Sequence, residues 1–253
     1  MNYIVLSRKW RPKNFDQVVG QEHVTKILTN AISANKVSHS YLFSGPRGVG
    51  KTTIARILAL KLNNIESLDK SLDIIELDGA SNRGIDEIRD LKDATKYVPI
   101  EGKYKVFIID EAHMLTKEAF NALLKTLEEP PSHVVFILAT TEIQKIPSTI
   151  SSRCQKYDFK KISLDNTIAH LERIINSEGY SSEPQALRAI ASKSEGSLRD
   201  ALSLLDKVFS ISDKEVTYDI VKDILGIVDE EIYLELIQQI FKGDTAASIT
   251  SVS

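Results

Sequence analysis

Apolar positions in the first 160 residues gather in short runs that alternate with longer amphipathic segments. The runs are apolar at consecutive positions, and they cover residues 40–45, 72–78, 105–110 and 134–141. Such runs are typical of strands buried on both faces, as in a parallel sheet covered by helices. Helical periodicity follows at residues 51–62, 85–95 and 116–129. The pattern predicts an α/β fold with a parallel sheet.

From about residue 160 the pattern changes to amphipathic helices alone. They cover residues 164–179, 183–196, 198–210 and 217–226, and several end at or near a glycine. We expect an α/β domain over residues 1–161 and a small helical domain over residues 162–227. Residues 228–253 begin another amphipathic helix and end in a polar tail, which we interpret as the start of a truncated third domain.

Composition narrows the classes of function. Hydrophobic residues make up 42% of the 253 residues, enough to fill a core. The net charge is −3, so any contact with nucleic acid must be a local patch. No apolar run reaches the roughly 20 residues that cross a bilayer, and the N-terminus lacks the pattern of a signal peptide. We therefore expect a cytoplasmic protein without membrane contact.

The stretch GPRGVGKT, at residues 45–52, follows the first apolar run and opens a helical segment. In this context the pattern predicts a phosphate-binding loop, in which backbone N–H groups and the helix N-terminus bind phosphate oxygens. Lys51 would reach the terminal phosphates and Thr52 would bind Mg²⁺. The predicted nucleotide-binding residues are Gly45, Pro46, Arg47, Gly48, Val49, Gly50, Lys51, Thr52 and Thr53. A glycine-rich turn before a helix is the weaker alternative.

Two carboxylates, Asp110 and Glu111, stand at the end of the third apolar run, where open α/β sheets bind ligands. We expect Asp110 to hold Mg²⁺, directly or through water, and Glu111 to deprotonate the attacking water. Neighbouring strand residues point to opposite faces, so Glu111 can do this only if the strand ends there. Two acidic residues that cap a strand are the alternative, which the phosphate loop makes weaker.

Spacing alone does not decide the roles of three other residues. Thr141, with Thr140 at the end of the fourth run, would hydrogen-bond the γ-phosphate or the water, or would only mark a turn. Arg153 is by itself a surface charge or an ion-pair partner. Cys154 is the only cysteine, which excludes an intramolecular disulfide and a multi-cysteine zinc site. It is either a reactive thiol or part of the core, and we favour the core.

Longer motifs resemble the clamp-loader AAA+ ATPases, and among them the gamma/tau subunits of bacterial DNA polymerase III. The motifs are HSYLFSGPRGVGKTTIARILA, GASNRGIDEIRDL, GKYKVFIIDEAHMLTKEAFNALLKTLEEPP, FILATTEIQKIPSTISSRCQ and EGSLRDALSLLD. The resemblance extends from SRKWRPKNFDQVVGQEHV to about residue 240. It implies an AAA+ P-loop domain with ATP as ligand, a three-helix lid, and a collar that joins five subunits in a ring.

The resemblance also implies roles for single residues. Arg153 would be an arginine finger that acts in the ATP site of a neighbouring subunit, which leaves Cys154 a packing role. Arg199 would reach the γ-phosphate from the lid of the same chain. Arg11 and the backbone at Val18 and Val19 would lie near the adenine and ribose. Hydrolysis would then require a partner subunit.

The implied partners are the delta and delta-prime subunits in a pentameric ring, the sliding clamp, and primed DNA bound through its phosphates. Arg89 and Lys125, with Arg83 as a weaker addition, match positions that contact DNA in the family. The bacterial subunits usually carry a four-cysteine zinc module where residues 60–78 have no cysteine, so we expect no zinc. Either the sequence covers part of the natural protein, or that protein is unusually short.

Together these expectations describe an ATP-driven motor subunit that opens the sliding clamp and loads it on primed DNA. One alternative is a delta-prime-like stator, which carries the arginine but typically has a degraded phosphate loop. The other is a Holliday-junction helicase-type AAA+ motor, which would need a C-terminal winged-helix domain.

Overall fold

The computed structural model describes residues 3–67, 71–227 and 241. The predicted start of a collar, residues 228–253, therefore lies outside the described residues except for Phe241. No helix among the described residues is long and apolar enough to cross a membrane.

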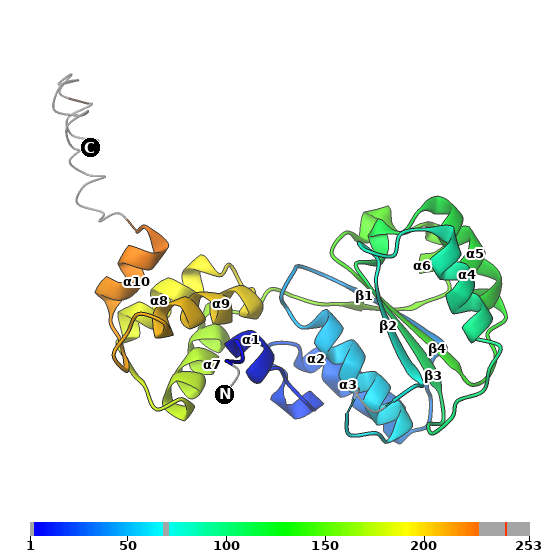
Figure 1. Cartoon of the computed structure of the whole chain (residues 1–253), viewed down its shortest axis with the longest axis horizontal. Helices are drawn as coiled ribbons and strands as arrows, with labels where there is room; N and C mark the ends of the chain where they lie inside the picture. Colours follow the sequence, from blue (N-terminus) through cyan, green and yellow to red (C-terminus); the bar gives the residue numbers. More distant parts are fainter. Residues whose placement is uncertain (1–2, 68–70, 228–240, 242–253) are drawn as a thin grey trace.

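A five-stranded parallel sheet forms the centre of the larger part of the molecule (Figure 1). Its strands are β1 (Ser40–Ser44), β2 (Ile74–Asp78), β3 (Lys105–Asp110), β4 (Val134–Thr140) and β5 (Gln155–Asp158). They lie in the order β2-β3-β4-β1-β5, and every pairing is parallel. The four strands predicted from apolar runs are all present. The predicted α/β fold with a parallel sheet is confirmed.

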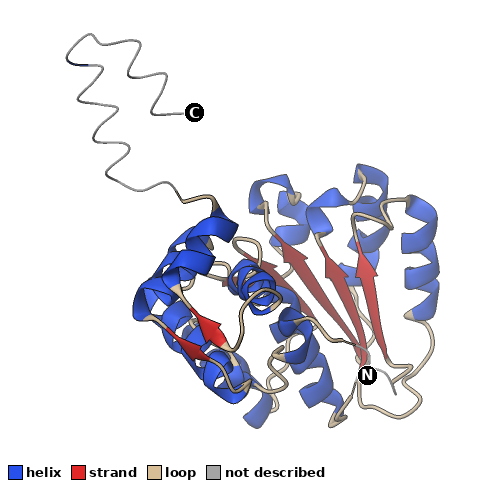
Figure 2. Ribbon diagram, turned by 60° about the vertical axis from the view of Figure 1, so that its left-hand side comes forward, coloured by secondary structure: helices blue, strands red, loops and turns tan. Residues whose placement is uncertain are grey.

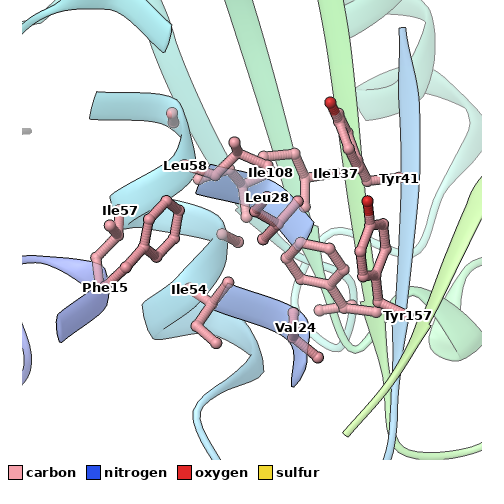
Figure 3. Packing of buried hydrophobic residues seen from close by; sticks show 14 of the residues in the cluster. Phe15, Val24, Leu28, Tyr41, Ile54, Ile57, Leu58, Ile108, Ile137 and Tyr157 are labelled. Carbon is pink, nitrogen blue, oxygen red and sulfur yellow. The ribbon is translucent and has the colours of Figure 1, made fainter. Parts of the chain in front are cut away.

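Helices cover both faces of this sheet. One face carries α2 (Glu22–Ser33) and α3 (Lys51–Asn63), and the other carries α4 (Ile85–Ala94), α5 (Lys117–Glu128) and α6 (Ser148–Ser151). Successive side chains of a strand point to opposite faces. In β3, Ile108 packs with Leu28 and Leu58 of α2 and α3 (Figure 3), whereas Phe107 and Ile109 pack against α4 and α5. Burial on both faces explains the continuous apolar runs.

The edge strands differ from the sequence expectation. The prediction that β2 is buried on both faces is wrong, because Ile75 and Leu77 are half-buried and Glu76 is exposed. β2 has a neighbour on one side only, so its burial is incomplete. The other edge strand, β5, was not predicted, since its side chains are exposed except for Tyr157. Helix α2 was also not predicted.

The smaller part of the molecule is helical, as expected, and lies beside the sheet domain (Figure 2). Its helices α7 (Leu164–Ser177), α8 (Pro184–Lys193), α9 (Leu198–Phe209) and α10 (Tyr218–Leu225) surround one cluster of buried apolar residues. Two short strands, β6 (Ser181–Ser182) and β7 (Glu215–Val216), pair in parallel. Short 3₁₀ helices occur in the connections of the larger part at Phe15–Gln17, Ala112–Met114 and Ile143–Lys145.

The N-terminal segment packs on the helical part, although the predicted limit at residue 161 assigns it to the α/β domain. Leu6 of α1 (Leu6–Lys9) is buried in the helical cluster. The Tyr3 hydroxyl donates a 2.6 Å hydrogen bond to Asp206 Oδ1, and Trp10 Nε1 donates one of 2.7 Å to Glu178 Oε1. The segment thus forms a second connection between the two parts. The domain limits stay predictions.

Asp73, just before β2, has a buried carboxylate. It accepts 2.8 Å hydrogen bonds from the backbone N–H groups of Ile100, Glu101 and Gly102. Burial alone would raise the pKa of Asp73, but the three amide donors and the charge of Lys105 outweigh burial and lower the pKa. The carboxylate therefore holds the loop that leads into β3.

We expect Asp73→Asn to lower the free energy of unfolding by about 1–3 kcal/mol at neutral pH, because an amide N–H₂ group would face backbone donors. The lowered pKa means that the carboxylate stabilises the fold above its usual pKa of 3.8. This contribution is lost as the pH falls toward the lower pKa of the folded state. Urea unfolding of both proteins, from about pH 7 to about pH 3, should show a difference that shrinks in acid.

Asp93→Asn is the matched control, because the exposed Asp93 carboxylate pairs with Lys96 at the surface. It should leave the free energy of unfolding unchanged within error. An Asp73→Asn protein as stable as the wild type at neutral pH would contradict the role of the buried carboxylate.

Candidate functional site

The predicted phosphate loop, residues 45–52, connects the end of β1 to the start of α3. Gly45, Gly48 and Gly50 have φ angles of +145°, +73° and +105°, which favour glycine. A Cβ atom at Gly45 would also lie 2.4 Å from the carbonyl oxygen of Phe159. The shape of the loop therefore requires these glycines. The loop ends at the N-terminus of a long helix, where anions bind favourably.

Lys51, the first residue of α3, is only 5% exposed. Its Nζ donates hydrogen bonds to the carbonyl oxygens of Gly45, at 2.8 Å, and Pro46, at 2.7 Å. Burial lowers the pKa of Lys51, and the negative charges of Glu111 and Asp110 oppose this effect. The amino group is thus held inside the loop, where it can neutralise an anionic ligand.

Thr52 and Asp110 are in direct contact. The Thr52 hydroxyl donates a 2.7 Å hydrogen bond to Asp110 Oδ2, which joins the start of α3 to the end of β3. Hydroxyl and carboxylate oxygens are the hard ligands that Mg²⁺ prefers. The two residues therefore fit the predicted Mg²⁺ site.

The strand ends where the role of Glu111 requires, because Asp110 is the last residue of β3. Glu111 has a φ of +47°, an uncommon left-handed conformation for a residue with a side chain. The change of direction lets Asp110 and Glu111 line the same cleft. The Thr141 hydroxyl donates a 3.1 Å hydrogen bond to Glu111 Oε2. Backbone strain of this kind is concentrated at functional sites.

The cleft lies between the phosphate loop, the N-terminal segment and the helical part, and it holds about 860 Å³ of space open to solvent. Small molecules commonly bind in concave sites between structural units. Its lining includes most of the predicted set, namely Arg11, Val18, Val19, Arg47, Gly48, Val49, Gly50, Lys51, Thr52, Thr53, Asp110, Glu111 and Arg199. Gly45, Pro46, Thr141 and Arg153 are not among the lining residues. The structure thus brings distant parts of the sequence together, while the residue roles stay predictions.

Sequence reasoning missed several lining residues: Ser7, Pro12, Gln17, His170, Leu198 and Leu202. Trp10 of the N-terminal segment also lines the cleft. His170 lies on α7, where burial lowers its pKa. Leu198 and Leu202 are one turn apart on α9, but this spacing is also typical of core positions. No local pattern distinguishes these residues, since only the packing of the helical part places them at the cleft.

The phosphate loop contacts α9 directly. The backbone N–H of Arg199 donates a 3.4 Å hydrogen bond to the carbonyl oxygen of Gly48. Ser197 caps α9 by accepting a hydrogen bond from the backbone N–H of Asp200. A Cβ atom at Gly48 would lie 2.0 Å from Ser197 Oγ. The position of the helical part is therefore coupled to the shape of the loop.

Arg153 follows α6 and lies outside the cleft of its own chain. Its Nη1 donates a 2.5 Å hydrogen bond to the carbonyl oxygen of Thr149, and its Nη2 forms an ion pair with Glu128. The side chain remains 33% exposed. The neighbouring Cys154 packs against the apolar cluster on the α5 face, and burial raises the pKa of its thiol. A raised pKa disfavours the reactive thiolate.

The predicted DNA contacts are exposed. Arg89 lies on α4 and pairs with Asp86 at 3.0 Å, whereas Lys125 lies on α5. Arg83 precedes α4, and its Nε donates a 2.8 Å hydrogen bond to the carbonyl oxygen of Ala80. Helices α4 and α5 pack side by side, so the three cations belong to one side of the sheet (Figure 1).

Comparison with known proteins places the chain in a family. A family model described as "DNA polymerase III, delta subunit" matches residues 20–163, and "DNA polymerase III clamp loader subunit, ATPase lid domain" matches residues 167–214. The chain is 46% identical to DNA polymerase III subunit tau of Escherichia coli, over 94% of this chain and 40% of that protein. It is 41% identical to subunit gamma of Buchnera aphidicola, over 97% of this chain and 72% of that protein.

The chain belongs to the DNA polymerase III gamma/tau family of clamp-loader ATPases. A tau relative from Bacillus subtilis is 47% identical over 98% of this chain. The chain spans 40% of the Escherichia coli tau subunit and 46% of the Bacillus subtilis one.

Among solved structures, the Thermotoga maritima RuvB Holliday junction branch migration motor is similar to this gamma/tau chain. The TM-score is 0.68 at 25% sequence identity, over 91% of this chain and 79% of that chain. This likeness confirms the predicted AAA+ fold. The matched lid, residues 167–214, includes nearly all of α7 and the whole of α8 and α9, as a three-helix lid requires. Helix α10 follows the matched residues.

We expect Gly48→Ala to weaken ATP binding and to lower the free energy of unfolding more than Gly179→Ala does. The two glycines have similar φ angles, +73° and +76°, so each substitution strains the backbone by about 1–2 kcal/mol. At Gly48 the new Cβ would also displace Ser197 Oγ, whereas nothing lies within 4 Å of the corresponding position at Gly179. Urea unfolding and ATP titration of both variants measure the difference. Equal effects would show that the contact between loop and lid is unimportant.

Proposed function

We propose that the chain binds ATP with Mg²⁺ in the cleft and hydrolyses it as a motor subunit of the DNA polymerase III clamp loader. The contact between Thr52 and Asp110, beside an intact phosphate loop, carries the proposal because its two oxygens would hold Mg²⁺ at the phosphate end of the cleft. Membership in the gamma/tau family supports the clamp-loader role. ATP binding and hydrolysis would drive opening of the sliding clamp and its loading on primed DNA.

Each group of the site has a defined task under this proposal. Mg²⁺, held by Thr52 and Asp110, would neutralise negative charge on the phosphates. The loop amides and Lys51 would bind the phosphate oxygens, where Lys51 already lies within the loop. Glu111 would accept the proton of the attacking water at its carboxylate, and Thr141 would hold that carboxylate.

The position of the lid would depend on whether the bound nucleotide carries a γ-phosphate. Arg199 lines the cleft, and its backbone N–H contacts the carbonyl oxygen of Gly48. A guanidinium near the γ-phosphate would draw the lid toward the phosphate loop, and loss of that phosphate would release it. Arg11, Val18 and Val19 line the cleft on the N-terminal segment and would contact the adenine and ribose.

Arg153 would act in trans. It lies outside the cleft of its own chain and keeps a third of its side chain exposed, so it is accessible to a neighbouring subunit. A planar guanidinium stabilises charge on a transferring phosphoryl group. A heterologous interface in a five-membered ring with the delta and delta-prime subunits would bring the finger and the phosphate together.

DNA would be bound through its phosphates by Arg89, Lys125 and Arg83. All three are exposed on one side of the sheet, and lysines and arginines need no base contact to hold a duplex of any sequence. The net charge of −3 agrees with a patch assembled from several subunits. A replication function of this kind implies a cytoplasmic protein.

Two other functions are less well supported. A delta-prime-like stator is consistent with the "DNA polymerase III, delta subunit" match, but the ordered phosphate loop with Lys51 and the acidic pair favours a nucleotide-hydrolysing subunit. A branch-migration motor is favoured only by the likeness to RuvB, at 25% identity. The three gamma/tau relatives described above are 41–47% identical to this chain over nearly its whole length.

Arg153→Ala should abolish DNA-stimulated ATP hydrolysis and leave ATP binding unchanged, because the guanidinium would act in the cleft of another subunit. Loss of an arginine finger lowers turnover by roughly 10³-fold or more. The measurement is ATP turnover of the subunit assembled with delta and delta-prime, with and without primed DNA and clamp. ATP affinity of the isolated chain is measured in parallel.

Arg188→Ala, an exposed arginine on α8 outside the cleft, is the control and should retain wild-type turnover. Equal loss of ATP binding and hydrolysis in Arg153→Ala would contradict the action in trans. A wild-type assembly without ATP turnover would refute the proposed function itself.

A further inference from the structure

His113 lies beside the proposed general base. It belongs to the 3₁₀ helix Ala112–Met114, directly after Glu111, and its side chain is only 7% exposed. Its Nδ1 is 3.1 Å from Thr140 Oγ1 and 3.4 Å from Glu111 Oε2. Its Nε2 is 3.3 Å from Glu142 Oε1. No motif in the sequence indicates a role for this histidine.

The ring of His113 is held from both sides. Thr140, at the buried end of β4, also accepts a 3.0 Å hydrogen bond from the backbone N–H of Glu142. Lys145 Nζ lies 2.8 Å from the same Glu142 oxygen that faces His113 Nε2. The imidazole is therefore a fixed support, anchored to β4 and to the turn that follows it.

The contacts of the Glu111 carboxylate involve one of its two oxygens. Within residues 3–67 and 71–227, the hydrogen bond from Thr141 reaches Oε2, and His113 Nδ1 lies 3.4 Å from the same oxygen. The other oxygen, Oε1, is then the one that can accept a proton from water. A glutamate side chain has several rotatable bonds, so a base that is not held would seldom point at the water.

We infer that His113 is a positioning residue, which holds Glu111 Oε2 so that Oε1 faces the attacking water. The inference rests on the proposed function, since it concerns the hydrolytic step at the same cleft. His113 would act through Glu111 and would not touch the nucleotide. Its loss should therefore lower kcat and leave KM for ATP unchanged.

Two substitutions separate this role from packing. In His113→Asn the amide can occupy the position of Nδ1, near Thr140 and Glu111. In His113→Gln the amide reaches the position of Nε2, near Glu142. Both remove the ring, so they share the cost of lost packing, while only the asparagine can keep the contact to Glu111.

The test is ATP turnover of each variant assembled with delta and delta-prime, in the presence of primed DNA and clamp. We expect His113→Gln to lower kcat roughly tenfold and His113→Asn to remain within about threefold of the wild type, with KM unchanged in both. His133→Ala is the control, since this histidine lies just before β4 and its Nε2 is 3.1 Å from the carbonyl oxygen of Thr95, away from Glu111. It should keep wild-type kcat.

Two results would overturn the inference. If the asparagine variant is no faster than the glutamine variant, the histidine serves packing alone. Wild-type kcat in His113→Gln would show that Glu111 needs no support from the ring. Failure of the proposed function is distinguishable from both, because then the wild-type assembly would not hydrolyse ATP.

Discussion

Parallel pairing of β3, β4 and β1 determines where the groups of the site lie. In the register of the sheet, Ser44 of β1 is opposite Thr140 of β4, and Ile109 of β3 is opposite Leu138. The C-terminal ends of the three strands therefore meet at one edge. The phosphate loop follows β1, the acidic pair lies at the end of β3, and Thr141 follows β4, so groups far apart in the sequence become neighbours.

The core fixes the start of the phosphate loop. Phe43 of β1 packs on Phe159 with ring centroids 5.2 Å apart, and the backbone N–H of Phe159 donates a 2.7 Å hydrogen bond to the carbonyl oxygen of Ser44. The Phe159 backbone then lies so close to Gly45 that no side chain fits there. The loop is held by packing before any ligand binds, and such preorganisation lowers the entropy lost on binding.

The sequence predicts well what depends on local pattern and poorly what depends on packing between distant elements. The central strands can be predicted because burial on both faces gives them continuous apolar runs. Strand β5 lies at the sheet edge, is mostly exposed and has no such run. The glycines and Lys51 of the phosphate loop follow from a local motif. His113 and His170 gain significance only from neighbours on other elements. The end of β3 before Glu111 could be stated from sequence as a requirement, and only the structure shows that it is met.

The proposed function depends on binding of the ATP triphosphate in the cleft, between Lys51, Thr52 and the lid. Equilibrium binding of labelled ATP in the presence of Mg²⁺, to the wild type and to Lys51→Ala, measures this directly. We predict saturable binding by the wild type and an affinity lowered at least about tenfold in the variant, because the ammonium interacts with phosphate in a poorly solvated loop. Wild type that binds no ATP, or equal affinity in the two proteins, would contradict it.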